Sequence, residues 1–262
     1  MTTTLIRRAG VLALIATTAA GLGGCAGVVG AKMTYDDTEK GKITDIVLSG
    51  GAGDITVTTA PVTETTIRRV IRQATNPDTS YQLQGTTLTI DTSCGMRCSV
   101  SYEIKTPPGV KVHGRQGSGD IRLDGVADTD LQLTSGDLIV ANATGPVQIR
   151  ATSGDIHVND AKSSVKVQST SGDIEALQAG GPVDVRVTSG DVRVSLAAPN
   201  SVTAHTTSGD VSVGVPQDGK YKLVTSHGSG DLNIDGLESD SSSKNVIDVR
   251  AGSGDVTVAS VG

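Results

Sequence analysis

Eight aspartates recur in one short turn, and their regular spacing is the feature of this sequence best suited to chemistry. Each follows Ser-Gly and precedes a β-branched residue or leucine. Carboxylates gathered along one edge could bind calcium, or they could be corner residues whose charge is offset by backbone N–H and hydroxyl donors. The eight, separated by 17 to 24 residues, are Asp120, Asp137, Asp155, Asp173, Asp191, Asp210, Asp231 and Asp255.

The glycine content of the turn helps to separate these two readings. Calcium-binding repeats of β-helices use a nonapeptide that is denser in glycine. Here one aspartate turn recurs about every eighteen residues, and serine stands where the calcium repeat has more glycine. The pattern favours corner residues, with no metal and no cofactor, and leaves a calcium ladder as the alternative. A weaker copy of the turn ends at Asp54, 66 residues before Asp120.

The N-terminus carries a different kind of signal, centred on Cys25. Arg7 and Arg8 precede an uncharged, mostly apolar run of 13 residues, 10–22. Such a run is too short for a membrane span and right for a secretory signal. It ends in Leu-Gly-Gly-Cys, which resembles the lipobox of bacterial lipoproteins, where the cysteine becomes lipidated. We therefore expect a signal peptide at 1–24 and a lipid on Cys25; the alternative is an ordinary signal peptide with an incidental cysteine.

The remaining cysteines, Cys94 and Cys98, bracket a three-residue loop between two expected strands. In an exported protein such a pair favours a disulfide, with a modest entropic gain because the loop is small. A thioredoxin-type redox motif has two intervening residues rather than three, and no histidine lies at ligand spacing for a metal. The pair is predicted to be structural.

The other reactive side chains form no recognisable catalytic set. His113, His157, His205 and His227 are scattered, and no nucleophile elbow accompanies the many serines. His205 falls on an outward position shared with Arg150, Gln168 and Arg186 in other repeats. His227 falls on a usually inward position and is expected to be a coil-edge imidazole.

The elements that position the aspartates are two short strands per repeat. Mostly apolar residues occupy the eighth, sixth and fourth positions before each aspartate and the first and third after it, as in Val183, Val185, Val187, Val192 and Val194. Polar residues stand between them, which is the period-2 pattern of half-buried strands. A period near twenty is typical of a solenoid. We predict an all-β, single-stranded parallel β-helix, right-handed, with about eighteen residues in each coil.

The chain divides into four expected segments. A flexible tether at 25–42 follows the signal peptide, an irregular N-terminal β region with the first coils spans 43–112, and the Ser-Gly-Asp solenoid spans 113–262. Within the second segment, 65–73 could be a helix by spacing, but its neighbours favour a strand. The residues 238–244 are expected to be a loop extruded from a coil.

Composition supports an exported surface protein. The formal net charge is −6, and removing residues 1–24 leaves 20 basic and 28 acidic residues, a net charge of −8. An acidic chain without a basic cluster carries no electrostatic footprint for nucleic acid. Phe and Trp are absent, so the core must be aliphatic.

Together the lipobox, the Ser-Gly-Asp repeats and the lead-in at 102–110 (Tyr-Glu-Ile-Lys-Thr-Pro-Pro-Gly-Val) resemble a bacterial family of β-strand repeats, the toast-rack or putative-adhesin domains. The resemblance covers roughly residues 43–260. It implies a cell-surface β-helix, in some members tied to envelope stress, with no established catalytic residues.

The sequence therefore favours a non-catalytic, lipid-anchored protein on the extracytoplasmic face of the cell membrane that binds or scaffolds envelope components. The alternatives are a polysaccharide-acting β-helix enzyme and a calcium-binding repeat protein. An enzyme of that kind needs clustered carboxylates, basic residues and aromatic sugar platforms, and the chain has neither Trp nor Phe.

Overall fold

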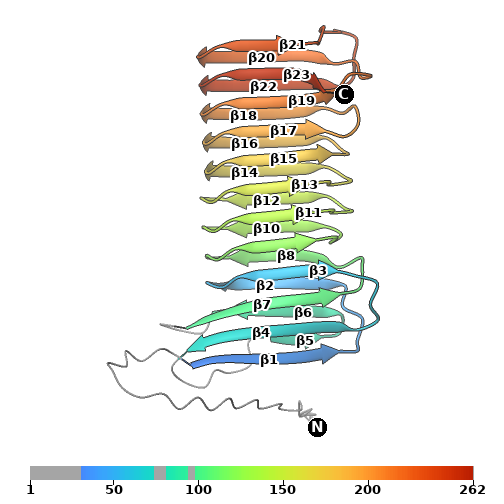
Figure 1. Cartoon of the computed structure of the whole chain (residues 1–262), viewed down its shortest axis with the longest axis vertical. Coiled ribbons are helices and arrows are strands. Elements are labelled where there is room, and N and C mark those ends of the chain that lie inside the picture. The colour runs from blue at the N-terminus through green and yellow to red at the C-terminus, as the bar shows by residue number, and fades with distance from the viewer. Residues whose placement is uncertain (1–30, 74–80, 94–97, 262) are drawn as a thin grey trace, which may run out of the picture.

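The protein is an elongated stack of β-strands in two facing sheets (Figure 1). The computed structural model describes residues 31–73, 81–93 and 98–261. No helix occurs among these residues, and in particular none long and apolar enough to cross a membrane. The expectation of an all-β solenoid is confirmed.

The first sheet contains twelve strands within the described residues. In spatial order they are β1 (Ala31–Glu39), β4 (Thr65–Gln73), β7 (Ser99–Thr106), β3 (Ile55–Thr59), β9 (Ile121–Asp124), β11 (Leu138–Ala141), β13 (Ile156–Asn159), β15 (Ile174–Ala179), β17 (Val192–Leu196), β19 (Val211–Pro216), β23 (Val256–Val261) and β21 (Leu232–Asp235).

The second sheet contains eleven strands in the described part of the chain. From the C-terminal end of the stack they are β20 (Lys222–Ser229), β22 (Val246–Ser253), β18 (Val202–Ser208), β16 (Val183–Ser189), β14 (Val165–Ser171), β12 (Val147–Ala151), β10 (Thr129–Leu133), β8 (Lys111–Gln116), β2 (Asp45–Gly51), β6 (Thr87–Thr92) and β5 (Tyr81–Gln84).

Each central coil places one strand in each sheet, and equivalent strands of successive coils pair in parallel. The pairing of β14 with β16 sets Val165 beside Val183 and Val167 beside Val185, and these four side chains are at most 3% exposed. Because side chains alternate between the faces of a strand, this register sends every apolar column inward. The core is therefore a continuous layer between the sheets, as the periodicity predicted. It is mainly aliphatic, but it also buries Tyr102 and Tyr221, each 1% exposed, which corrects the expectation of a wholly aliphatic core.

The order of the coils in space differs from their order in the chain at both ends. The coil β2–β3 lies between β6–β7 and β8–β9, and β22–β23 lies between β18–β19 and β20–β21. In Figure 1 the β20–β21 coil ends the stack, with β22–β23 beneath it. The segment 238–244 therefore belongs to the connection that carries the chain back into the stack, which corrects its assignment as a loop extruded from one coil.

The N-terminal end is closed by antiparallel strands. β1 pairs with β4, and β4 with β7, while β5 and β6 form a hairpin. The strand expected at 65–73 is confirmed over the helical alternative. The tether expected at 25–42 is wrong for 31–39, because these residues form β1. The alternation in Met33, Tyr35 and Asp37 was too polar to predict a strand from the sequence. Pairing with β4 supplies the backbone hydrogen bonds of this strand.

One arginine organises this cap. Arg69 is 8% exposed and lies between the rings of Tyr35 and Tyr81, 5.0 Å from each ring centroid. Its Nη2 is 2.8 Å from Asp37 Oδ2, so its charge is paired as well as stacked. Burial raises the pKa of Tyr81, and the nearby carboxylates Asp37 and Glu39 raise it further.

Candidate functional site

The repeated aspartates form a single row at the corner between the two sheets, which we call the corner ladder. In each step the backbone N–H of one aspartate donates to Oδ1 of the aspartate in the adjacent coil, at 2.8 to 3.2 Å. In spatial order the ladder is Asp54, Asp120, Asp137, Asp155, Asp173, Asp191, Asp210, Asp255 and Asp231.

The ladder refines the expectation for these residues in two ways. Each bonded carboxylate does accept a backbone N–H, but the donor belongs to the neighbouring coil rather than to the same turn. Asp54, the outlying copy in the sequence, is a full member, since Asp120 N–H donates to its Oδ1. The ladder also follows the spatial order of the coils, so Asp255 stands between Asp210 and Asp231.

The glycine before each aspartate is required by close backbone contact. Gly172 has φ of +107°, and a Cβ there would lie 2.2 Å from the carbonyl oxygen of Gly154. Gly154 has the same φ and the same relation to Gly136, at 2.1 Å. A positive φ and a missing Cβ are the two properties that only glycine combines. The Ser-Gly-Asp turn is therefore a stacking corner.

This arrangement spreads the ladder's carboxylates one to a coil, about 4.8 Å apart. Among the residues that the structure describes, no three His, Cys, Asp or Glu side chains come together in a group able to hold a metal ion. General acid–base chemistry likewise needs groups that converge on one substrate atom. The corner ladder supports stacking of the coils more directly than catalysis.

A second row of polar side chains runs along the outward face of the second sheet. Parallel pairing places one of its residues on each of seven consecutive strands, from β8 to β22. Its members are arginines alternating with amides or histidine, and we call it the Arg/Gln column: Arg115, Gln132, Arg150, Gln168, Arg186, His205 and Arg250. None of its members is acidic, so the row presents hydrogen-bond donors to solvent.

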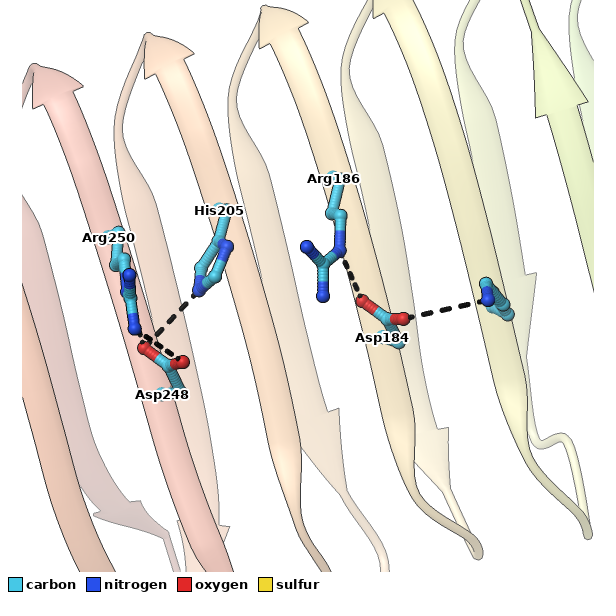
Figure 2. Close-up of polar contacts among 6 residues, drawn as sticks. Asp184, Arg186, His205, Asp248 and Arg250 are labelled. Carbon is cyan, nitrogen blue, oxygen red and sulfur yellow. Dashed lines mark hydrogen bonds and ion pairs between the residues drawn. The ribbon is translucent and has the colours of Figure 1, made fainter.

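At its C-terminal end the Arg/Gln column is neutralised by acidic neighbours (Figure 2). Arg250 forms a two-point contact with Asp248 at 2.8 and 3.0 Å, and Arg186 Nε donates to Asp184 Oδ1 at 2.9 Å. His205 Nε2 is 3.2 Å from Asp248 Oδ1. That last approach is an ion-pair distance without hydrogen-bond alignment, because the same nitrogen is buried with no aligned partner.

Asp248 is the most perturbed carboxylate of this group. Its partial burial alone would raise its pKa, but the hydrogen bonds from Arg250 and the positive charges of Arg250 and His205 outweigh burial and lower the pKa. The carboxylate therefore stays charged and holds both neighbours in place. This part of the column is structurally satisfied.

At the other end of the column a hollow of about 450 Å³ opens where β8, β10 and β12 end. Arg115, Gln132 and Arg150 line it, together with Thr134 and Thr152, which lie two residues after Gln132 and Arg150. Arg150 Nη1 is 3.8 Å from Asp130 Oδ1, a loose contact. In the described part of the chain no carboxylate lies within 4.0 Å of the Arg115 guanidinium. The hollow is accordingly cationic and rich in donors.

Glycines and a buried amide create this hollow. Gly117 stands where the next five repeats along the chain have threonine, and a Cβ on it would lie 2.7 Å from Gly51 O. Beneath it Gln116 is 2% exposed, and its Nε2 donates to the carbonyl oxygens of Gly53 and Ser118, at 3.0 and 2.8 Å. The sequence analysis missed Gln116; the signal was a glutamine at a position that is apolar in most repeats.

A second hollow, of about 650 Å³, lies over β1, β4 and β7 on the first sheet. Its Arg68 is compensated, with Nε 2.7 Å from Asp36 Oδ1 and Nη1 3.8 Å from Glu103 Oε2. The mixed charges of this lining cancel locally. The hollow beside Arg115 therefore differs from it in having excess positive charge.

The histidines and cysteines are placed as follows. His205 faces outward as expected. On the first sheet, His157 Nδ1 of β13 lies 3.1 Å from Glu175 Oε2 of the neighbouring strand β15. His227 is exposed, because β20 is the end strand of the stack. Cys98 packs against the edge of the core. Cys25 and Cys94 lie outside the described residues, so lipidation and the Cys94–Cys98 disulfide stay predictions.

Comparison with known proteins agrees with this architecture. The chain is similar to a putative adhesin from Parabacteroides distasonis, with a TM-score of 0.55, 11% identity, and coverage of 88% of this chain and 98% of that one. A putative adhesin from Parabacteroides merdae gives a TM-score of 0.52 at 13% identity, covering 89% of this chain and 97% of that one. At these identities the likeness shows the fold alone.

Sequence comparison identifies the family more directly. No curated protein matches the chain. The model of the family described as Toastrack DUF4097 matches residues 32–181 and again 161–259, which together span nearly the whole described stack. The chain therefore belongs to the Toastrack DUF4097 family.

Proposed function

We propose that this protein is a non-catalytic surface solenoid, anchored by a lipid on Cys25 to the extracytoplasmic face of the cell membrane, that binds or scaffolds components of the envelope. The observation that carries the proposal is the Arg/Gln column, a continuous row of arginine, glutamine and histidine side chains across seven parallel strands. A row of this kind suits an extended ligand contacted at many points. A catalytic centre would instead gather its groups around one point.

The family and its neighbours support a cell-surface role. The solved structures similar in fold are named putative adhesins, and adhesion is a property of those proteins by name. A rigid stack with a polar outward face is suited to presenting such a surface away from a membrane. The lipid on Cys25 would be the attachment point, since residues 1–24 have the features of a cleaved signal peptide.

Anchoring is tested by labelling cells that express the full chain with a fatty-acid analogue. We expect the wild type to be labelled, to fractionate with membranes and to be digested by protease added to intact protoplasts or spheroplasts. The Cys25→Ser variant should lose the label and the membrane association. Label retained by that variant, or protection of the wild type from protease, would contradict the proposed anchoring and location.

Binding is tested separately, by sedimenting the purified chain with washed cell envelopes. We expect co-sedimentation of the wild type and a clear reduction for Arg150→Gln combined with Arg186→Gln and Arg250→Gln. A matched triple variant on the first sheet, Arg122→Gln with Arg193→Gln and Arg68→Gln, controls for lost positive charge. Equal co-sedimentation of the two triple variants would remove the Arg/Gln column from the proposal.

A further inference from the structure

The end of the Arg/Gln column at the hollow differs from the rest in its charge balance. Arg186 and Arg250 are held by acidic partners on their own strands, at 2.8 to 3.0 Å. Arg150 is 3.8 Å from its nearest carboxylate oxygen, and Arg115 has none within 4.0 Å among the described residues. An arginine whose five donors are not used by the protein is available for a ligand. The positive charge available for binding is concentrated here.

We propose that this hollow binds an anionic glycan in which acidic sugars alternate with neutral ones. The proposal rests on the proposed function and deepens it by naming the class of ligand. The carboxylates of the acidic sugars would pair with Arg115 and Arg150, whose guanidinium groups can each donate to two carboxylate oxygens in a planar, two-point contact. The glycan would lie along the stack, across β8, β10 and β12.

The alternation follows from the register of these three strands. Gln132 on β10 lies beside Arg115 on β8 and beside Arg150 on β12. Neighbouring strands are about 4.8 Å apart, so the two arginines are about 10 Å apart with a neutral amide between them. Charged, neutral and charged donors in series match a chain whose anionic groups are separated by an uncharged unit.

The threonines that line the hollow suit the neutral parts of such a ligand. Thr134 and Thr152 are exposed, and their hydroxyls can both donate to and accept from sugar hydroxyl groups. The floor is rigid, because Gln116 is held by the carbonyl oxygens of Gly53 and Ser118. A rigid floor lowers the entropy lost on binding.

Other linear ligands fit this surface less well. Nucleic acid binding draws on broad positive potential and on aromatic stacking, whereas this chain has a net charge of −6 and no Trp or Phe. An extended peptide would need an open sheet edge, but β8, β10 and β12 are each paired on both sides. A donor-lined hollow without an open edge favours a glycan.

The test uses the purified full chain, with affinity measured by titration calorimetry at low and at physiological ionic strength. The probes are hyaluronan oligosaccharides, in which glucuronate alternates with an uncharged sugar, dextran as a neutral glycan, and polyphosphate as an anion without sugar. We expect hyaluronan to bind, dextran not to bind, and polyphosphate to bind at least tenfold more weakly than hyaluronan. Binding should weaken as salt rises, since the contacts are charged and exposed.

Variants locate the site. Arg115→Gln with Arg150→Gln should weaken hyaluronan binding about tenfold or more, because two charge-assisted contacts are lost. Arg122→Gln, an exposed arginine of β9 on the other sheet, should leave it unchanged. All these positions are exposed, so thermal midpoints should match the wild type and confirm folding.

Three results would overturn the inference. They are absence of hyaluronan binding, polyphosphate binding as tight as hyaluronan binding, and an equal loss from Arg122→Gln and from the double variant. None of them bears on lipid labelling or envelope co-sedimentation. Failure of this inference is therefore distinguishable from failure of the proposed function.

Discussion

At the scale of single residues, the corner ladder converts a row of like charges into contacts between coils. Carboxylates about 5 Å apart repel by about 1 kcal/mol in water. Each bonded Oδ1 offsets part of this by accepting a backbone N–H from the next coil, as in Asp191 N–H to Asp173 at 2.8 Å. The acceptor, rather than the charge, is what the corner requires.

This distinction predicts different outcomes for two substitutions at Asp173. Asp173→Asn keeps an Oδ1 acceptor and removes one charge from the row, so the free energy of unfolding should change by no more than about 0.5 kcal/mol. Asp173→Ala leaves the Asp191 N–H without its acceptor and should cost about 1 kcal/mol. Denaturant titration measures both.

The effect of calcium on stability distinguishes aspartates that act as structural corner residues from aspartates that bind metal. A structural corner predicts that chelator leaves the thermal midpoint of the wild type unchanged, since metal binding contributes to folding only where a metal is bound. A midpoint lowered by chelator and restored by calcium but not magnesium, together with equal losses from the Asn and Ala variants, would identify the aspartates as ligands.

The glycine of the same turn should be far less tolerant. Gly172→Ala places a Cβ 2.2 Å from Gly154 O in a backbone with φ of +107°. We expect the free energy of unfolding to fall by about 1–3 kcal/mol. Gly109 has φ of +93° with open space around it, so Gly109→Ala reports the cost of φ alone. Equal losses in urea titrations of the two variants would show that close stacking is not what selects glycine.

At the scale of elements, strand register decides which side chains are core and which are surface. Val185 on β16 is fully buried, whereas Gln168 on β14 faces outward between Arg150 and Arg186. A one-residue slip would exchange these faces along the whole strand. The regular columns of the sheets keep the register fixed.

Introducing the same residue at both positions tests this arrangement. Val185→Asp buries a carboxylate with no partner and should unfold the central coils or cost several kcal/mol. Gln168→Asp puts a carboxylate between two arginines and should be neutral or slightly stabilising. Circular dichroism melts compare the two directly, and similar midpoints would mean that the strand faces are misassigned.

The contacts of Asp248 with its neighbours should also make the stability of the protein depend on pH in the acid range. Because Arg250 and His205 lower the pKa of Asp248 below its unfolded value near 4, its stabilising contribution is full above about pH 4 and disappears as pH falls through the folded pKa. Asp248→Asn should therefore reduce the thermal midpoint at pH 6, and its midpoint should converge with that of the wild type as the pH falls through the folded pKa of Asp248. Asp130→Asn is the control, because Asp130 contacts Arg150 only loosely. A difference in thermal midpoint between Asp248→Asn and the wild type that stays the same at all pH values would show that titration of Asp248 does not contribute to stability.

At the scale of the whole molecule, the reversed order of the last two coils changes which residues are terminal. Leu232 on β21 and Val256 on β23 occupy the same position after their aspartates and are paired in register. Leu232 is 39% exposed at the end of the stack, while Val256 is fully buried between β19 and β21. Chain order alone would have placed Val256 at the end.

The two positions therefore make a matched test of the topology. Val256→Asp should strongly destabilise the C-terminal coils and expose the amides of β20 to β23 to hydrogen exchange, because it severs two coil interfaces. Leu232→Asp should have a small effect restricted to β20 and β21. The opposite ranking in exchange and in thermal midpoints would mean that the coils stack in chain order.

The sequence by itself determined the local parts of this protein. The period of the Ser-Gly-Asp turns and the alternation of residues such as Val183 and Val185 were both readable, because they depend on contacts near in the chain or repeated at a fixed interval. The outward position of His205 followed from the same alternation.

Only the tertiary structure decided the order of the coils and the features that depend on it. Nothing local records that Asp54 stands next to Asp120, that β22–β23 inserts beneath β20–β21, or that residues 31–39 pair with β4. The hollow at Arg115 has the same origin, since Gly51 and Gly117 meet there although they are more than 60 residues apart in the chain. Every coil presents nearly the same strand edges to its neighbours, so the periodic sequence determines the geometry of stacking but not the order of the coils. The order is determined by the segments that connect one coil to the next.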